Sequence, residues 1–228
     1  MTRTGIQRQP EPGDWPVLYG LATKEDTAEA AKLYLASFPA RAGKWFPERH
    51  HAECFHADLM ELMRLAHGKT FFTVHSGSRF VGFLILTLPN KVLVKALFRG
   101  GFILRVVVHA LTGGYGFSGR VLWRAAGSLL ARPGSSVERT YFRDPHVYAI
   151  AVSTDFTGRG IGSALIERGR EACAGKFSRM WLYVDHENTG ARRLYARIGF
   201  HTVGSADEQD LMVWNFARLA ETEGRIPV

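Results

Sequence analysis

An apolar run followed by a glycine-rich turn constrains this chain more than any other stretch. Residues 146–152 (HVYAIAV) are β-branched, aromatic or small, and they are apolar on both faces, which is typical of a buried strand. A polar turn follows, and then Gly158, Gly160 and Gly162 lead into a segment whose apolar spacing predicts a helix ending near Gly175. The chain therefore contains a buried strand, a turn, and a helix whose first residues carry few side chains.

Such a helix start is suited to binding phosphate. With side chains absent, a ligand can touch backbone N–H groups at the positive end of the helix dipole. A flexible loop that happens to contain glycines is the alternative. The P-loop motif is excluded because no lysine and Ser/Thr follow the last glycine. Spacing alone leaves the Rossmann fingerprint open, since Asp185 lies 23 residues after Gly162.

Composition narrows the class of protein and of partner. A chain of 228 residues suits a single domain, predicted over residues 15–220, and the polar residues 1–14 are predicted to form a disordered arm. A net charge of +8 favours an anionic partner such as a polyphosphate cofactor or acidic lipid. Nucleic acid is not expected, because no Arg/Lys run or zinc-finger spacing occurs.

With only Cys54 and Cys173, and no apolar leader segment, we expect a cytoplasmic protein without disulfides.

The first half of the chain reads as a strand, two helices and a hairpin. These are predicted at residues 15–21, 23–39, 47–67, 70–75 and 80–88. His50 and Cys54 lie one turn apart on the second helix, which makes a metal site conceivable. No fourth ligand is evident nearby, so a histidine-rich helix face is preferred and no metal is expected.

Residues 91–136 form an unusual insert that is apolar with regularly spaced cations. At helical spacing its basic residues share one face; they are Lys91, Lys95, Arg99, Arg105 and His109. Residues 100–101 are predicted to break this segment into two helices, and a further helix is predicted at residues 119–130. The charges recur too often for a transmembrane span. Packing on the domain is preferred, and peripheral contact with an anionic membrane or dimerisation through residues 91–130 are the alternatives.

Two motifs in the second half resemble those of a known family. Residues 151–165 resemble the acyl-CoA motif of the GNAT superfamily of N-acyltransferases. Residues 188–200 (NTGARRLYARIGF) resemble its second signature, N-x-x-A-x-x-L-Y-x-x-x-G-F, in the right order and with a predicted strand, residues 179–185, between them. The resemblance implies an α/β fold with a mixed central sheet flanked by helices and a helical insert between the third and fourth strands.

The resemblance also implies a co-substrate, acetyl-CoA or another acyl-CoA. Backbone groups of Ile150, Ala151 and Val152 would pair with the pantetheine arm, and Asn188 would hydrogen-bond it or cap the following helix. The pyrophosphate would meet the N–H groups of the glycine-rich turn, which comprises Gly158, Arg159, Gly160, Ile161, Gly162 and Ser163. Thr157 stands where the family usually has Arg or Gln, which removes one charge.

For the chemistry, the resemblance assigns Tyr195 as the acid that protonates the departing thiolate. His146 is the candidate base, and strand alternation predicts that it shares a face with Tyr148 and Ile150. Asp185 or an ordered water is the alternative base. The expected reaction is acyl transfer to the primary amine of a small molecule or peptide, by direct attack in a ternary complex. A long-chain N-acyl synthase or a catalytically silent CoA-binding module are the alternatives, and the acceptor is not identifiable from these residues.

Overall fold

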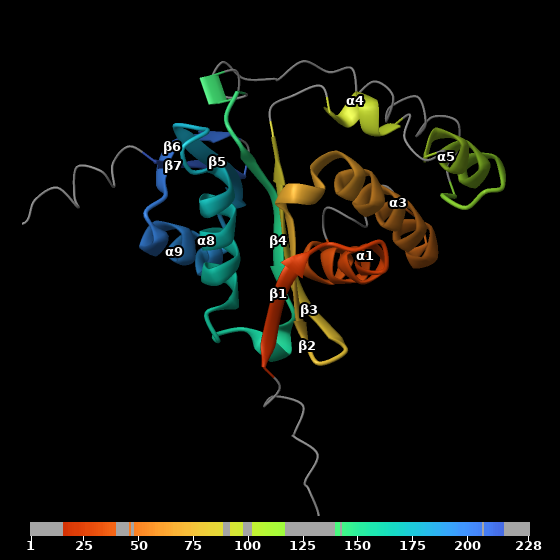
Figure 1. Cartoon of the computed structure of the whole chain (residues 1–228), viewed down its shortest axis with the longest axis horizontal. Helices are drawn as coiled ribbons and strands as arrows, with labels where there is room; N and C mark the ends of the chain where they lie inside the picture. The colour runs from red at the N-terminus through yellow and green to blue at the C-terminus, as the bar shows by residue number, and fades with distance from the viewer. Residues whose placement is uncertain are drawn as a thin grey trace, which may run out of the picture.

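Seven strands form one mixed sheet in the order β1-β2-β3-β4-β5-β7-β6 (Figure 1). This computed structural model describes residues 16–39, 46, 48–88, 92–97, 102–116, 140–141, 143–206 and 208–216. The predicted arm at residues 1–14 and the predicted helix at 119–130 lie outside the described residues. Neighbouring strands are antiparallel except β4 and β5, which are parallel. The α/β architecture expected from the sequence is confirmed.

The seven strands are β1 (Val17–Leu21), β2 (Phe71–Ser76), β3 (Arg79–Thr87), β4 (His146–Val152), β5 (Arg179–Asp185), β6 (His201–Ala206) and β7 (Gln209–Asn215). The bounds of the first five lie within two residues of those that the sequence predicts. The bounds of β4 and β5 match the prediction because both strands are nearly continuous apolar runs, as expected for strands buried on both faces.

Helices cover both faces of the sheet (Figure 1). On one face, α1 (Asp26–Ser37) and α3 (Arg49–His67) bury Ala30, Met60 and Met63 against β2, β3 and β4. On the other, α8 (Ile161–Cys173) and α9 (Thr189–Ile198) enclose a larger core around Leu165 and Ile166. The two cores lie on opposite sides of the sheet, and each β4 residue from Val147 to Val152 contributes to one or the other.

A β-bulge at Tyr148 changes that alternation. Val147 is opposite Leu86 of β3, but Ala149 is opposite Ile85, so Tyr148 is the extra residue. As a result Ile150 packs against the α8 core, whereas Tyr148 packs on the α1 and α3 side. The prediction that His146 and Ile150 share a face is therefore wrong.

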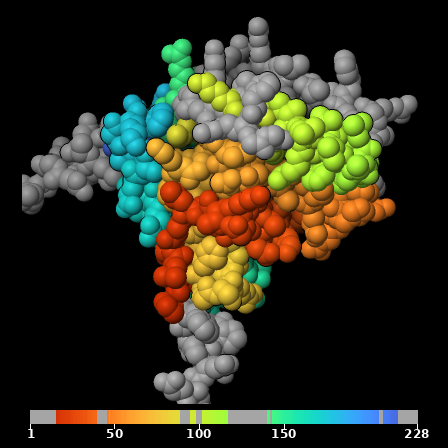
Figure 2. Space-filling model, turned by 45° about the vertical axis from the view of Figure 1, so that its right-hand side comes forward, coloured from red at the N-terminus to blue at the C-terminus, as the bar shows by residue number. Residues whose placement is uncertain are grey.

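The described part of the insert packs on the domain. It contains α4 (Val92–Leu97) and α5 (Phe102–Leu111), which lie against α3 (Figure 2). Ala96 and Phe102 are buried with Leu62 of α3. The apolar residues Ile103, Leu104, Val107, Val108 and Leu111 of α5 are exposed instead. Among the described residues, no helix has the length and apolar character needed to cross a membrane.

Candidate functional site

A cavity opens where β4 and β5 separate. The two strands share only two residue pairs, His146 with Trp181 and Val147 with Leu182. A bulge bends the strand that carries it, and β4 diverges from β5 directly after the bulge at Tyr148. The cavity between the diverging ends has a volume of about 330 Å³. Its walls include every β4 residue from Val147 to Val152.

Of the predicted cofactor-binding residues, five line this cavity directly. They are Ile150, Ala151, Val152, Gly162 and Asn188. Beyond Val147, β4 has no strand partner on its β5 side in the described sheet. Its peptide groups there are available to an extended ligand, in the way that an exposed sheet edge accepts an added strand.

The glycine-rich turn adjoins the cavity and leads into α8. Gly158 and Gly160 have φ angles of +77° and +78°, which are strained for any residue with a side chain. A side chain at Gly162 would contact Leu194 of α9, so that glycine permits close packing of two helices. The three glycines therefore have two distinct structural roles.

The first turn of α8 provides backbone donors beside the cavity. Its first intrahelical bond runs from Ala164 N–H to the Gly160 carbonyl, so the N–H groups of Ile161, Gly162 and Ser163 precede the helix ladder. Ile161 itself is buried in the α8 core, which leaves only its backbone to meet a ligand. This is the arrangement that binds anions at helix N-termini.

Two polar residues of the predicted site have partners within the protein. The exposed Arg159 guanidinium lies 4.9 Å from the centroid of the Phe156 ring. Asn188 caps α9, and its Oδ1 accepts a hydrogen bond of 3.0 Å from Ala191 N–H. Asn188 lines the cavity as well, so capping and contact with a ligand are compatible there.

Tyr195 of α9 lines the cavity and is 6% exposed. Burial raises the pKa of the Tyr195 phenol to about 12. A phenol with this pKa keeps its proton at neutral pH, so Tyr195 is available there as a proton donor and not as a base.

His146 lies beside the cavity, and its side chain is not among those that line it. The imidazole stacks on Trp181, with ring centroids 4.1 Å apart, and its Nδ1 is 3.5 Å from Thr87 Oγ1. Trp181 faces away from the α8 core, so His146 lies on the α1 and α3 side of the sheet.

The cavity wall also includes residues that no sequence motif singles out. Tyr34, Ser37 and Phe38 line it from the end of α1, and Tyr183 lines it from β5. They belong to no motif, and their place depends on how α1 crosses the sheet. Asp185, the alternative base, lines the cavity too, and its Oδ1 accepts a hydrogen bond of 2.6 Å from Gln209.

Comparison with known proteins agrees with this geometry. The sequence model of the acetyltransferase (GNAT) family matches residues 28–200, which contain both helical layers and the cavity. Mycothiol acetyltransferase of Kineococcus radiotolerans is 46% identical over 54 residues, a match that spans 24% of this chain and only 18% of that protein.

Solved structures share the fold over most of the chain. A protein named SsHAT superimposes with a TM-score of 0.63 at 19% identity, covering 88% of this chain and 98% of its own. The PaiA N-acetyltransferase of Thermoplasma acidophilum, determined in complex with coenzyme A, superimposes with a TM-score of 0.52 at 12% identity. That match covers 88% of this chain and 99% of the PaiA chain. At these identities the likeness is one of fold.

Proposed function

Because the chain belongs to the GNAT acetyltransferase family, we propose that it transfers an acetyl group from acetyl-CoA to a primary amine. The observation that carries this proposal is the separation of β4 from β5 after only two residue pairs. It leaves a strand edge, a helix N-terminus and a buried tyrosine around one cavity.

The donor would bind along β4 and the start of α8. Its pyrophosphate would accept hydrogen bonds from the N–H groups of Arg159 to Ser163, and its pantetheine arm would pair with the free edge of Ile150 to Val152. The thioester would then lie deeper in the cavity, toward Tyr195. Backbone groups supply most of these contacts, which is consistent with the absence of an Arg or Gln at Thr157.

The reaction would proceed by direct attack in a ternary complex. The neutral amine attacks the thioester carbonyl carbon, a C–N bond forms, and the C–S bond then breaks. The departing thiolate takes the phenolic proton of Tyr195, while a base accepts the proton lost by the amine. His146, Asp185 and a water molecule are the candidates for this base. Holding both substrates in one cavity lowers the barrier without a covalent enzyme intermediate.

The acceptor would enter from the α1 side of the cavity. There Tyr34 and Phe38, at the C-terminal end of α1, line the cavity together with Tyr183 and Asp185 of β5. Aromatic faces and a carboxylate would attract an amine in its cationic form, and Asp185 is one of the candidates to accept its proton. The acceptor is accordingly a small molecule or a peptide with an accessible primary amine.

Thiol release tests this proposal. The purified chain would be mixed with acetyl-CoA and a panel of polyamines, amino acids, amino sugars and peptides, and free CoA would be measured with a thiol reagent. We expect amine-dependent release that depends on Tyr195. Tight binding of acetyl-CoA without turnover of any amine would instead identify a silent binding module and contradict the proposed reaction.

A second cavity favours a longer acyl group as the second candidate function. It has a volume of about 310 Å³ between α3 and α5, and its walls are almost entirely apolar, including Leu59, Leu62 and Val106. A series of acyl-CoA donors from two to sixteen carbons distinguishes the candidates. Preference for the long donors, lost in Leu62→Trp, would support a long-chain N-acyl synthase.

The exposed face of α5 supports an association with a membrane or with a second copy. Its five exposed apolar residues, Ile103, Leu104, Val107, Val108 and Leu111, lie on one short helix. Sedimentation with anionic vesicles and the mass in solution would separate the two cases, with Leu104→Glu as the disrupting variant. Location in the cytoplasm, peripheral to a membrane in the first case, stays a prediction.

A further inference from the structure

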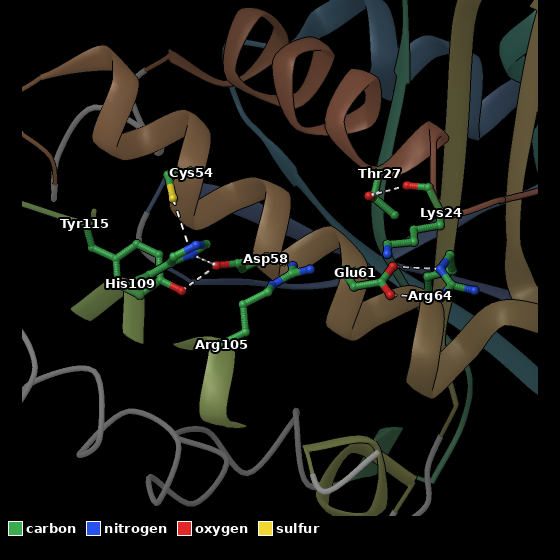
Figure 3. Close-up of polar contacts among 9 residues, drawn as sticks. All are labelled: Lys24, Thr27, Cys54, Asp58, Glu61, Arg64, Arg105, His109 and Tyr115. Carbon is green, nitrogen blue, oxygen red and sulfur yellow. Dashed lines mark hydrogen bonds and ion pairs between the residues drawn. The ribbon is translucent and has the colours of Figure 1, made fainter. Parts of the chain in front are cut away.

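A second cluster of reactive side chains lies away from the cavity between β4 and β5, at the place where α5 packs on α3 (Figure 3). Cys54 and Asp58 are one turn apart on α3, and His109 approaches them from α5. The acyl-transfer mechanism uses none of the three. The cluster brings together a sulfur, a carboxylate oxygen and an imidazole nitrogen from two helices.

The ligand atoms of these residues converge on one point. His109 Nδ1 lies 2.7 Å from Asp58 Oδ2 and 3.5 Å from Cys54 Sγ. All three atoms lie within 4.8 Å of one another. Asp58 is 4% exposed, and Cys54 and His109 are half-buried. A buried carboxylate in such a place requires partners that compensate its charge.

The geometry does not fit a cysteine nucleophile. In a Cys-His-Asp relay, the cysteine and the carboxylate contact different nitrogens of the imidazole. Here both Cys54 and Asp58 contact the same atom, His109 Nδ1. Convergence of all three on one point is the arrangement of ligands around a cation.

The groups behind the cluster are those that support a metal ligand. Tyr115 OH donates a hydrogen bond of 2.5 Å to Asp58 Oδ2, and Arg105 forms an ion pair with Asp58 Oδ1 (Figure 3). Carboxylates that bind metals are commonly held by such outer hydrogen bonds, which fix their orientation. Arg105 contacts the oxygen that His109 does not, which leaves Oδ2 directed at the cluster.

We propose that Cys54, Asp58 and His109 bind a zinc ion that fastens α5 to α3. Zinc accepts thiolate, imidazole and carboxylate ligands together in tetrahedral geometry, and its donor atoms then lie roughly 3–4 Å apart. The hydrogen-bond distance of 2.7 Å between His109 Nδ1 and Asp58 Oδ2 would therefore lengthen when the ion binds. Binding displaces the thiol proton of Cys54 and leaves the imidazole proton of His109 on Nε2, so that Nδ1 offers its lone pair. The fourth position is filled by water.

This site is not the one that residue spacing suggests. His50, one turn before Cys54, is exposed and pairs with Glu48 at 3.2 Å. The partner of Cys54 is His109, 55 residues further along the chain. The expectation that no metal binds considered only ligands near one another in the sequence, and α5 brings the third ligand from the insert.

Cobalt spectroscopy on the chelator-treated full chain tests the proposal. One equivalent of Co²⁺ should produce a thiolate charge-transfer band in the near ultraviolet and d–d bands typical of tetrahedral coordination, and Zn²⁺ should displace both. Cys54→Ser should abolish the charge-transfer band, and His109→Gln should weaken binding by at least about tenfold. His50→Gln, on the exposed side of the same helix, should bind as the wild type does.

A second measurement needs no variant. Zn²⁺ should slow alkylation of Cys54 in the native wild-type chain, with the fully buried Cys173 as the internal reference for unfolding. Zinc should also raise the thermal midpoint, because a ligand that binds only the folded state stabilises it. Absence of a thiolate band together with unchanged alkylation of Cys54 would overturn the proposal.

Discussion

His146 and Trp181 are both cross-strand partners and stacked rings, with centroids 4.1 Å apart. They form one of only two pairs that join β4 to β5, so the imidazole is held at the point from which the strands diverge. A base in this position would be rigid and close to the cavity. Its role is therefore open to a direct test.

If His146 is the base, His146→Gln should lower kcat by about 100-fold, the usual contribution of a positioned proton acceptor. If the wild type loses rate at acid pH, that loss should be absent in His146→Gln, since glutamine has no proton to exchange in this range. Asp185→Asn, at a residue that lines the cavity, is the matched comparison. A normal pH profile in His146→Gln, with a flattened one in Asp185→Asn, would assign the base to Asp185.

Tyr195→Phe should reduce kcat by about 100-fold and leave KM for acetyl-CoA nearly unchanged, because the phenol acts on the leaving thiolate. Burial raises the Tyr195 pKa to about 12, so the wild-type acid should stay protonated throughout the neutral and mildly alkaline range. Steady-state kinetics measure both effects. Tyr19→Phe, on β1 outside the cavity, is the control, and equal rates for all three proteins would refute the acid role.

Gly160→Ala should weaken both the fold and CoA binding. Gly160 has a φ of +78°, where a side chain costs about 1–2 kcal/mol, although the space around it is open. For a chain of this size a loss of 1 kcal/mol lowers the thermal midpoint by about 2–4 °C. Gly20→Ala is the control, because a Cβ there also meets nothing within 4 Å and Gly20 has no positive φ. Equal midpoints in the two variants would contradict the strained turn.

Stability should fall as the pH drops from 7.5 to 5.5. Burial lowers the pKa of His56 and of His67, each of which is 6% exposed. Below the ordinary histidine value of about 6.5, the unfolded chain then takes up protons that the folded chain does not. Each proton contributes a slope of at most about 1.4 kcal/mol per pH unit. The stabilising contribution of the two buried, neutral histidines is therefore complete above about pH 6.5 and is lost progressively below it.

Urea unfolding at the two pH values, with a chelator present, measures this slope. His67→Gln should reduce the slope, and His50→Gln should not, because His50 is exposed. His67 Nδ1 accepts a hydrogen bond of 3.4 Å from Leu88 N–H, which requires the neutral ring. An unchanged slope in His67→Gln would show that the buried ring titrates alike in both states.

The strand and helix that would hold the donor were predictable because their sequence signals are local. The bounds of β4 follow from residues 146–152 alone, and the start of α8 follows from the glycines before it. The bulge at Tyr148 was not predictable in this way, since it exists only in the register between β4 and β3. The predicted face of His146 relative to Ile150 was wrong for that reason.

The α1 side of the cavity and the insert depend on long-range packing. Tyr34 and Phe38 reach the cavity because α1 crosses the sheet near β4, which no periodicity in the chain records. The basic stripe expected on the insert is also only partly a surface feature, because Arg105 and His109 turn inward to Asp58. The buried carboxylate of Asp58 on α3 sets the inward orientation of these two side chains, and the sequence of the insert alone does not indicate that contact.

Calorimetric titration with acetyl-CoA tests the central claim most directly. The wild-type chain should bind one acetyl-CoA, and Ala191→Trp, which fills the cavity from α9, should abolish binding. Ala196→Trp, on the exposed side of the same helix, should bind as the wild type does. Absence of binding by the wild type, or equal binding by Ala191→Trp, would contradict the assignment of this cavity to the acyl donor.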